Sequence, residues 1–158
     1  MNDLGPGYTM TLTRSFDAPR ELVFDCFTTA EHLAAWWGPR TFTAPVCEID
    51  ARPGGAILIH MAGPEPYGIN EITGEVAEID RPARLALLLR GFQGDDGEWG
   101  IEHLSTLDFA ETADGRTEMT LTTVVRKVSE ALKPALNGMK EGWNQSFDKL
   151  EELLAEIG

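Results

Sequence analysis

Four polar side chains in stretches of alternating hydropathy have the chemistry of an acid–base site. They are His60, Glu71, Arg90 and His103, and all lie on segments that the alternation predicts to be strands. A histidine or carboxylate whose pKa is shifted inside a pocket can act as a general acid or base. Spacing alone does not show that these groups converge, so the alternative is that they are solvent-facing or hydrogen-bonded strand residues, and no catalytic residue is assigned.

The phase of the strands separates the two strand histidines. His103 is in phase with Leu107 and Phe109, which favours an inward position. His60 is in phase with Leu58 and opposite to its isoleucine neighbours, so inward and outward positions are equally arguable.

Large apolar side chains on several separate segments are candidates for the wall of a small-molecule pocket. Such pockets are lined mostly by apolar and aromatic groups with a few polar ones. For each candidate the alternative is ordinary core packing. The candidates are Trp36, Trp37, Phe42, Trp99, Met139, Trp143 and Phe147.

Motifs that would indicate a cofactor or a metal are absent from the sequence. There is no nucleophile elbow, phosphate-binding loop or dinucleotide fingerprint. Neither HExxH nor paired Cys/His spacing occurs, so no metal site and no cofactor are expected. Cys26 and Cys47 lie in apolar patterns without CxxC spacing and are predicted to be buried free thiols.

A long amphipathic segment at the C-terminus is the element around which the candidates must be arranged. From Leu132 to Ile157 the large apolar residues recur at steps of three and four, which predicts a helix with one broad apolar face. Pro134 and Gly138 leave the start of this helix uncertain by several residues. No second helix of comparable length is predicted, so the partner of the apolar face must be a sheet.

Seven strands and two short helices are predicted before that helix. A short helix opens near Asp17–Glu21 and another spans 31–36, while residues 1–7 form a Gly/Pro-rich tail that is expected to be mobile. A long flexible loop carrying Trp99 is expected over 91–100. The predicted strands are 8–16, 42–49, 56–61, 70–79, 84–92, 103–110 and 117–125.

These elements predict a single α+β domain over residues 1–158. Hairpin-length connections indicate an antiparallel sheet, and a twisted sheet of about seven strands tends to curl. A curled sheet with the C-terminal helix across its concave face buries both apolar patterns.

Composition excludes several classes of partner. With 26 acidic and 13 basic residues the formal charge is −13, which disfavours nucleic acid and anionic membrane surfaces. The sequence has no apolar run long enough to cross a bilayer, and its first residues lack the features of a signal peptide. A cytoplasmic location is therefore expected.

Four short motifs resemble successive signatures of one family. The order in which they occur makes the resemblance specific, although each motif alone is weak, and it covers about residues 9–157. They are the segment from Arg14 to Phe24, Glu31-His32-Leu33 with Trp36-Trp37-Gly38-Pro39, Arg52-Pro53-Gly54-Gly55, and Glu141-Gly142-Trp143 followed by Leu150. The sequence resembles the START-like (SRPBCC) superfamily, and within it the family named after the activator of the heat-shock-protein-90 ATPase.

The resemblance implies a helix-grip fold of the birch-pollen-allergen type, with an apolar cavity between sheet and helix. Together with Trp37, Trp99 and Trp143 on separate elements, it leads us to expect a cavity on the order of 300 Å³ or more. The function it implies is binding of an apolar small molecule that is lipid-, polyketide- or aromatic-like. Two alternatives stay open: a small cyclase- or hydrolase-like enzyme that uses polar pocket residues, and a chaperone-regulating interaction module with a protein partner or as a homodimer. With a single domain predicted over residues 1–158, we expect no counterpart of the namesake's additional amino-terminal domain, which weakens the chaperone alternative.

Gly142 lies inside the best helical stretch, where glycine is unfavourable by about 1 kcal/mol. We therefore expect another element to approach the helix closely at this point, with the rings of Trp36 and Trp37 as candidates. The alternative is that Gly142 faces water. Close approach predicts that Gly142→Ala overpacks the site and lowers stability by about 1 to 3 kcal/mol.

Overall fold

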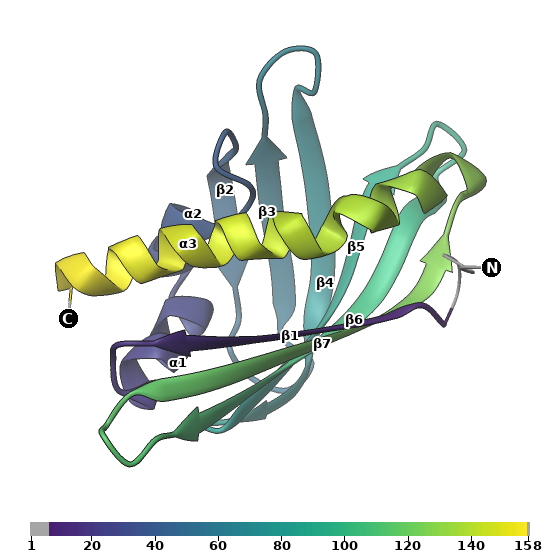
Figure 1. The fold of residues 1–158 in the computed structure, drawn as a ribbon. Helices are drawn as coiled ribbons and strands as arrows, with labels where there is room; N and C mark the ends of the chain where they lie inside the picture. The colour runs from purple at the N-terminus through teal and green to yellow at the C-terminus, as the bar shows by residue number, and fades with distance from the viewer. Residues whose placement is uncertain (1–6, 158) are drawn as a thin grey trace.

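The computed structural model describes residues 7–157 (Figure 1). The predicted tail therefore lies mostly outside the described residues, and the amide of Gly7, its last residue, donates to the carbonyl of Val125 at 2.7 Å. The helices are α1 (Arg20–Thr28), α2 (Ala30–Trp36), a 3₁₀ helix η1 (Glu130–Gly138) and α3 (Met139–Ile157). The strands are β1 (Thr9–Phe16), β2 (Thr43–Ile49), β3 (Ala56–Ala62), β4 (Ile69–Asp80), β5 (Arg84–Gln93), β6 (Trp99–Glu111) and β7 (Thr117–Val128).

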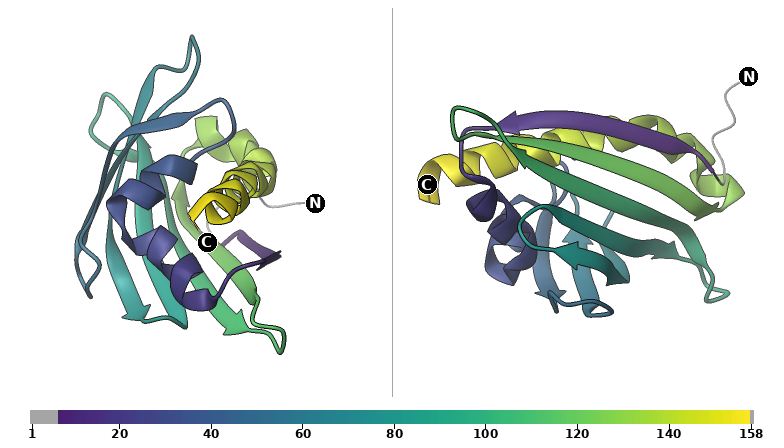
Figure 2. Two further views of the ribbon diagram at one scale, coloured as in Figure 1. Left: turned by 90° about the vertical axis from the view of Figure 1, so that its left-hand side faces the viewer. Right: turned by 90° about the horizontal axis from the view of Figure 1, so that it is seen from below.

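One seven-stranded antiparallel sheet, in the order β1-β7-β6-β5-β4-β3-β2, forms the frame of the molecule. Strands β2 to β7 follow one another as hairpins, and β1 joins the far edge beside β7. The sheet curls, and η1 and α3 cross its concave side together with α1 and α2 (Figures 1 and 2). This arrangement confirms the predicted α+β helix-grip fold. Within residues 7–157, no helix is both long and apolar enough to cross a membrane.

The core lies between the concave face and the helices. Alternate residues of each strand point inward, as the burial of Leu85, Leu87 and Leu89 on β5 illustrates. Aromatic rings join the helices to the sheet, with centroid distances of 4.7 to 6.4 Å. The rings belong to Phe16, Phe27, Trp36, Phe109 and Phe147.

The C-terminal segment is helical over the predicted range but has two parts. Its first part, η1, has 3₁₀ geometry, and the α-helix begins only at Met139. Pro134 has no amide hydrogen and clashes with the preceding turn of an α-helix, and Gly138 is a poor helix former. The two residues thus mark the change from one helix type to the other.

The predicted long loop over residues 91–100 was wrong. Strand β5 continues to Gln93 and pairs with Trp99, the first residue of β6, so that only residues 94–98 form the connection. Glycines within this stretch indicated a loop, yet Gly100 belongs to the sheet. A Cβ at Gly100 would lie 2.4 Å from Leu132 Cδ1 and 2.6 Å from the carbonyl oxygen of Phe92, so only glycine allows this approach of η1.

Candidate functional site

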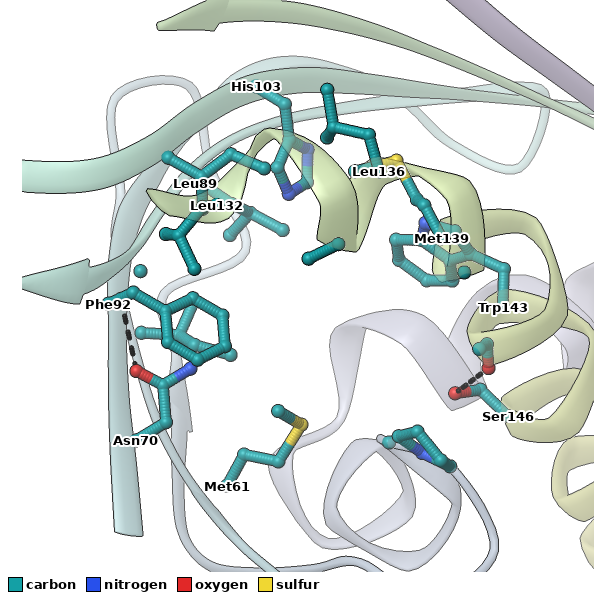
Figure 3. A pocket seen from close by; sticks show the side chains of 18 of the residues that line it. Met61, Asn70, Leu89, Phe92, His103, Leu132, Leu136, Met139, Trp143 and Ser146 are labelled. Atoms are coloured by element: carbon teal, nitrogen blue, oxygen red, sulfur yellow. Dashed lines mark hydrogen bonds between the residues drawn. The ribbon is translucent and has the colours of Figure 1, made fainter. Parts of the chain in front are cut away.

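A cavity of about 520 Å³ lies between the sheet and the C-terminal helices. We call it the main cavity. Strands β3 to β6 supply one side, η1 and α3 supply the other, and the segment Trp37–Pro39 closes one end (Figure 3). Its volume falls in the range of small-molecule sites. Apart from a few polar groups, the wall is apolar.

The helical side of the main cavity carries the indole ring of Trp143 and the thioether of Met139. The half-buried indole of Trp143 stacks on Phe147 and meets Trp37 edge to face, both at centroid distances of 5.5 Å. Met139 lies one turn earlier on the same side (Figure 3). Rings of this kind offer large flat contact surfaces, and a thioether adapts its shape to what it touches.

His103 is the titratable group that projects into the main cavity from β6 (Figure 3). Its Nδ1 lies 2.9 Å from the hydroxyl of Ser105, which in turn lies 2.8 Å from the hydroxyl of Thr123. Its Nε2 has no hydrogen-bond partner among residues 7–157. Burial lowers the pKa of His103 from 6.5 to about 4, so the ring is neutral at neutral pH.

The hydroxyl chain behind His103 is compatible with either neutral tautomer. If Ser105 donates to Thr123, it accepts from His103 Nδ1–H, and Nε2 is then an acceptor toward the cavity. If Thr123 donates to Ser105, the directions reverse and Nε2–H is a donor. A bound molecule can thus select the form that suits it.

Arg90 is the one charged residue on the main cavity wall within the described part of the chain. Its guanidinium donates to Glu75 at 3.0 and 3.1 Å and to Glu102 at 2.8 Å. These partners raise the pKa of Arg90, and its hydrogen bonds lower the pKa of Glu75. Strand alternation places all three side chains opposite to inward Leu89, so this charge is satisfied on the outer face.

Asn70 is a cavity residue that sequence reasoning missed. Its Oδ1 accepts the backbone amide of Phe92 at 3.0 Å, which fixes the orientation of the carboxamide (Figure 3). Its Nδ2 is buried and has no hydrogen-bond partner within the part of the chain that the structure describes. Asparagine is depleted in strands, so its presence inside the predicted strand 70–79 was the available signal.

A second pocket of about 510 Å³ adjoins the main cavity at the β3–β4 end of the sheet. Phe42, predicted as a pocket residue, lies here rather than on the main cavity, with its ring edge to face with Tyr67 at 5.3 Å. Glu71 also lies on this second pocket and is 3.2 Å from His60 Nε2. His60 itself lines neither pocket, because it faces away from buried Ile57 and Ile59.

Three further predicted wall residues lie elsewhere. Trp36 and Phe147 are fully buried in the core, and the indole of Trp36 donates to the carbonyl of Cys26 at 2.9 Å. Trp99 is at the start of β6, outside the wall of either pocket. Of the predicted residues, the structure brings together on the main cavity Trp37, Arg90, His103, Met139 and Trp143.

Lys149 fixes the segment that closes the cavity. Its ammonium lies 3.1 to 3.4 Å from the carbonyl oxygens of Trp37, Gly38, Pro39 and Phe42. Burial lowers the pKa of Lys149. We call this set of contacts the lysine clamp, because it holds residues 37–42 against α3.

The close approach expected at Gly142 involves Pro39 rather than the tryptophan rings. A Cβ at Gly142 would lie 3.9 Å from Pro39 Cγ, which is an ordinary van der Waals distance. The expected overpacking was therefore wrong: the neighbouring segment does meet the helix here, but it leaves room for a methyl group.

Thiols and possible metal ligands add no chemistry to the site. Burial raises the pKa of Cys26 and of Cys47 to about 11, and Cys47 is only half-buried, contrary to the prediction. Across the described residues, no three His, Cys, Asp or Glu side chains are grouped to hold a metal ion.

Comparison with known families supports the resemblance seen in the motifs. The family model described as Activator of Hsp90 ATPase homolog 1-like protein matches residues 17–155. The chain belongs to this family. No protein of curated function matches the sequence.

Solved structures of bacterial relatives share the fold of this family member. A protein of Staphylococcus epidermidis is 28% identical, with a TM-score of 0.76 over 94% of this chain and 90% of that one. One of Mycobacterium smegmatis is 27% identical, with a TM-score of 0.76 over 92% and 90% of the two chains. One of Arthrobacter aurescens reaches a TM-score of 0.81 at 22% identity, over 100% and 91%.

Proposed function

We propose that this family member binds a neutral, apolar small molecule in the main cavity. The observation that carries the proposal is a cavity of about 520 Å³ whose wall is apolar apart from a few polar groups. Trp37, Met139 and Trp143 give it flat and adaptable contact surfaces, and His103 gives it one polar anchor.

The charges around the main cavity favour an uncharged ligand over an anionic one. A fatty-acid carboxylate needs a cation or several donors when it leaves water. The charge of Arg90 is already balanced by Glu75 and Glu102, and the His103 ring is neutral because its pKa is about 4. The formal charge of −13 adds long-range repulsion of anions. An uncharged lipid-, polyketide- or aromatic-like molecule fits these conditions.

Titration with Nile red, a neutral apolar dye, tests the proposal. We expect saturable fluorescence enhancement with the wild type and loss of it in Gly142→Leu, whose side chain would occupy space beside Pro39 on the cavity wall. Ala155→Leu is the matched control, since this residue is exposed on the same helix. Equal binding by all three proteins, or none by the wild type, would refute the proposal.

An acid–base enzyme is the second candidate, and the chain His103–Ser105–Thr123 favours it. A histidine backed by hydroxyls and open to a cavity can move a proton at Nε2. Its pKa of about 4 lies well below the neutral range in which a general base works best, so we place binding first. Turnover of a bound ligand that disappears in His103→Gln, with ligand affinity retained, would reverse this order.

A further inference from the structure

The main cavity and the second pocket are neighbours that share a wall. Met61, Tyr67, Asn70 and Phe92 line both. The two spaces are of similar size, about 520 and 510 Å³. A molecule that passes these four side chains would therefore occupy both spaces.

Asn70 places an unused hydrogen-bond donor in that shared wall. The amide of Phe92 occupies its Oδ1, so turning the carboxamide over would set Nδ2 against another N–H group. Nδ2 is consequently held in place and buried, and no residue from 7 to 157 accepts its hydrogen bond. Native proteins rarely leave a buried donor unpaired, and such a group calls for an acceptor that arrives from outside the chain.

Phe92 has the features of a movable boundary. It is the one non-glycine residue with positive φ (56°) in the described part of the chain, a conformation that side chains rarely adopt. Its backbone amide is hydrogen-bonded to the Asn70 carboxamide (Figure 3), and the residue is 44% exposed. Tyr67 at 68% and Ile69 at 64% exposure also line the second pocket, so large apolar side chains gather at its rim without cover.

We propose that the ligand is elongated and carries a neutral acceptor oxygen part-way along its length. Because Nδ2 is buried, side chains at this boundary must move aside before it donates to that oxygen. One apolar arm then fills the main cavity, and the other passes Phe92 into the second pocket. This inference rests on the proposed function and adds the position and chemistry of the polar group.

The acceptor belongs to a ketone or an ester rather than to a carboxylate. Asn70 offers one neutral donor, and Glu71 on the second pocket would repel an anion. A ketone oxygen needs only one donor to replace its contact with water, whereas a carboxylate would lose several.

Three probes of matched length separate these chemistries: dipentyl ketone, undecane and undecanoic acid. Binding is followed by NMR through the indole Nε1–H of Trp143, which reports on the main cavity, and the side-chain amide of Asn70, identified by its absence in Asn70→Leu. Binding exchanges the ketone's hydrogen bond to water for one to Asn70, so the affinity of each probe is compared between the wild type and Asn70→Leu, where one hydrogen bond of about 1.4 kcal/mol corresponds to a tenfold change. Only the ketone should move the Asn70 amide resonances strongly, and the acid should bind weakest.

Asn70→Leu should weaken the ketone about tenfold and leave undecane unchanged. Asn137→Leu, the same change at an exposed residue that lines neither pocket, is the control and should change neither by that factor. Undecane binding also reports that the cavity of Asn70→Leu is folded, so loss of both probes would mark Asn70 as structural and overturn the inference. An unchanged affinity for the ketone in Asn70→Leu would overturn it as well.

The failure of the proposed function would look different. No response of Trp143 to any probe would remove ligand binding itself. Response of Trp143 to ketone and undecane alike, with unmoved Asn70 resonances, would leave the proposed function standing and remove only the role of Asn70.

Discussion

His103 combines partial exposure toward a cavity with an environment that excludes its charged form. Its Nδ1 is engaged by Ser105, while its Nε2 faces a mostly apolar space. Protonation in the folded state would place a charge there without a counter-ion, which is why the pKa falls to about 4. The residue is thus a neutral polar anchor at physiological pH.

The lowered pKa of His103 predicts that the folded protein loses stability in acid. Its folded pKa of about 4 lies below its ordinary value of 6.5, so the unfolded chain binds more protons between these values and stability falls as the pH is lowered through this window. Between pH 7 and pH 5 the wild type should lose about 2 kcal/mol more unfolding free energy than His103→Gln. Urea melts at both pH values measure this difference, and equal losses in the two proteins would contradict it.

Alanine substitutions of Trp143 and Phe147 distinguish a side chain on the cavity wall from one in the packed core. Phe147 is fully buried, so Phe147→Ala should lower the unfolding free energy by about 3 to 5 kcal/mol. Trp143 is half-buried and faces the cavity, so Trp143→Ala should cost less, about 2 kcal/mol, and should weaken Nile red binding. Urea melts and dye titrations of both variants check this, and a larger stability loss for Trp143→Ala would assign it to the core.

Sequence reasoning reached part of the site, and its failures have a common physical cause. Trp143 and Phe147 lie on one stripe of α3, and both point inward. Helical periodicity identifies which face of the helix points inward. Whether that face meets packed side chains or a cavity depends on strands that are far away in the sequence. For the same reason Trp36 and Trp37, adjacent in the chain, lie in the core and on the cavity respectively.

At the scale of elements, the lysine clamp connects α3 to the segment that ends the cavity. The backbone carbonyls of residues 37–42 point at one ammonium group, at 3.1 to 3.4 Å. Hydrogen bonds from a charged donor stabilise a structure by about 1.5 to 3 kcal/mol. The position of Trp37 on the cavity therefore depends on a residue that does not line it.

Lys149→Met keeps the length of the side chain and removes the donor. We expect a loss of about 1 to 3 kcal/mol in unfolding free energy and faster amide hydrogen exchange in residues 38–42. Lys140→Met on the same helix is the control, because Lys140 is exposed, and it should change stability by less than about 0.5 kcal/mol. Unchanged exchange in the clamped segment would show that the clamp does not hold it.

Gly142→Ala should stabilise the protein. The new methyl would meet Pro39 at an ordinary distance of 3.9 Å, while the helix gains the propensity difference between alanine and glycine, about 1 kcal/mol. Thermal melts measure the change, with Ala155→Gly expected to show the reverse sign on the exposed side of the helix. A lower melting temperature for Gly142→Ala would indicate the overpacking that the sequence suggested.

The ends of helices and strands were predictable where the alternation or the helical spacing of apolar residues was not interrupted by clustered glycines. The period-two pattern placed the strands to within a few residues, except at residues 91–100, where glycines required by close packing resembled a loop. Arg14 is the polar break on the apolar side of the first strand. It donates to the carbonyl of Asn144 at 3.0 Å and pairs with Asp148 on α3, a contact across the fold that local pattern does not contain.

At the scale of the whole molecule, topology follows from two apolar patterns that must cover one another. Seven antiparallel strands and one long amphipathic helical segment can bury their apolar faces together only if the helix lies across the concave face of the sheet. The structure has this arrangement (Figure 1). The cavity arises because α3 packs against α1, α2 and β1 and η1 packs against β6, while Met139 and Trp143 face β4 and β5 across the open space. Its existence is a property of this curvature rather than of any single residue.

Native mass spectrometry of the purified protein is the most direct test of ligand binding. We expect the wild type and Ala155→Leu, after exposure to dipentyl ketone, each to carry one bound molecule per chain, and Gly142→Leu to carry none. Undecanoic acid offered at the same concentration should give little or no adduct. An adduct of equal abundance on Gly142→Leu, or no adduct on the wild type with any apolar probe, would contradict binding in the main cavity.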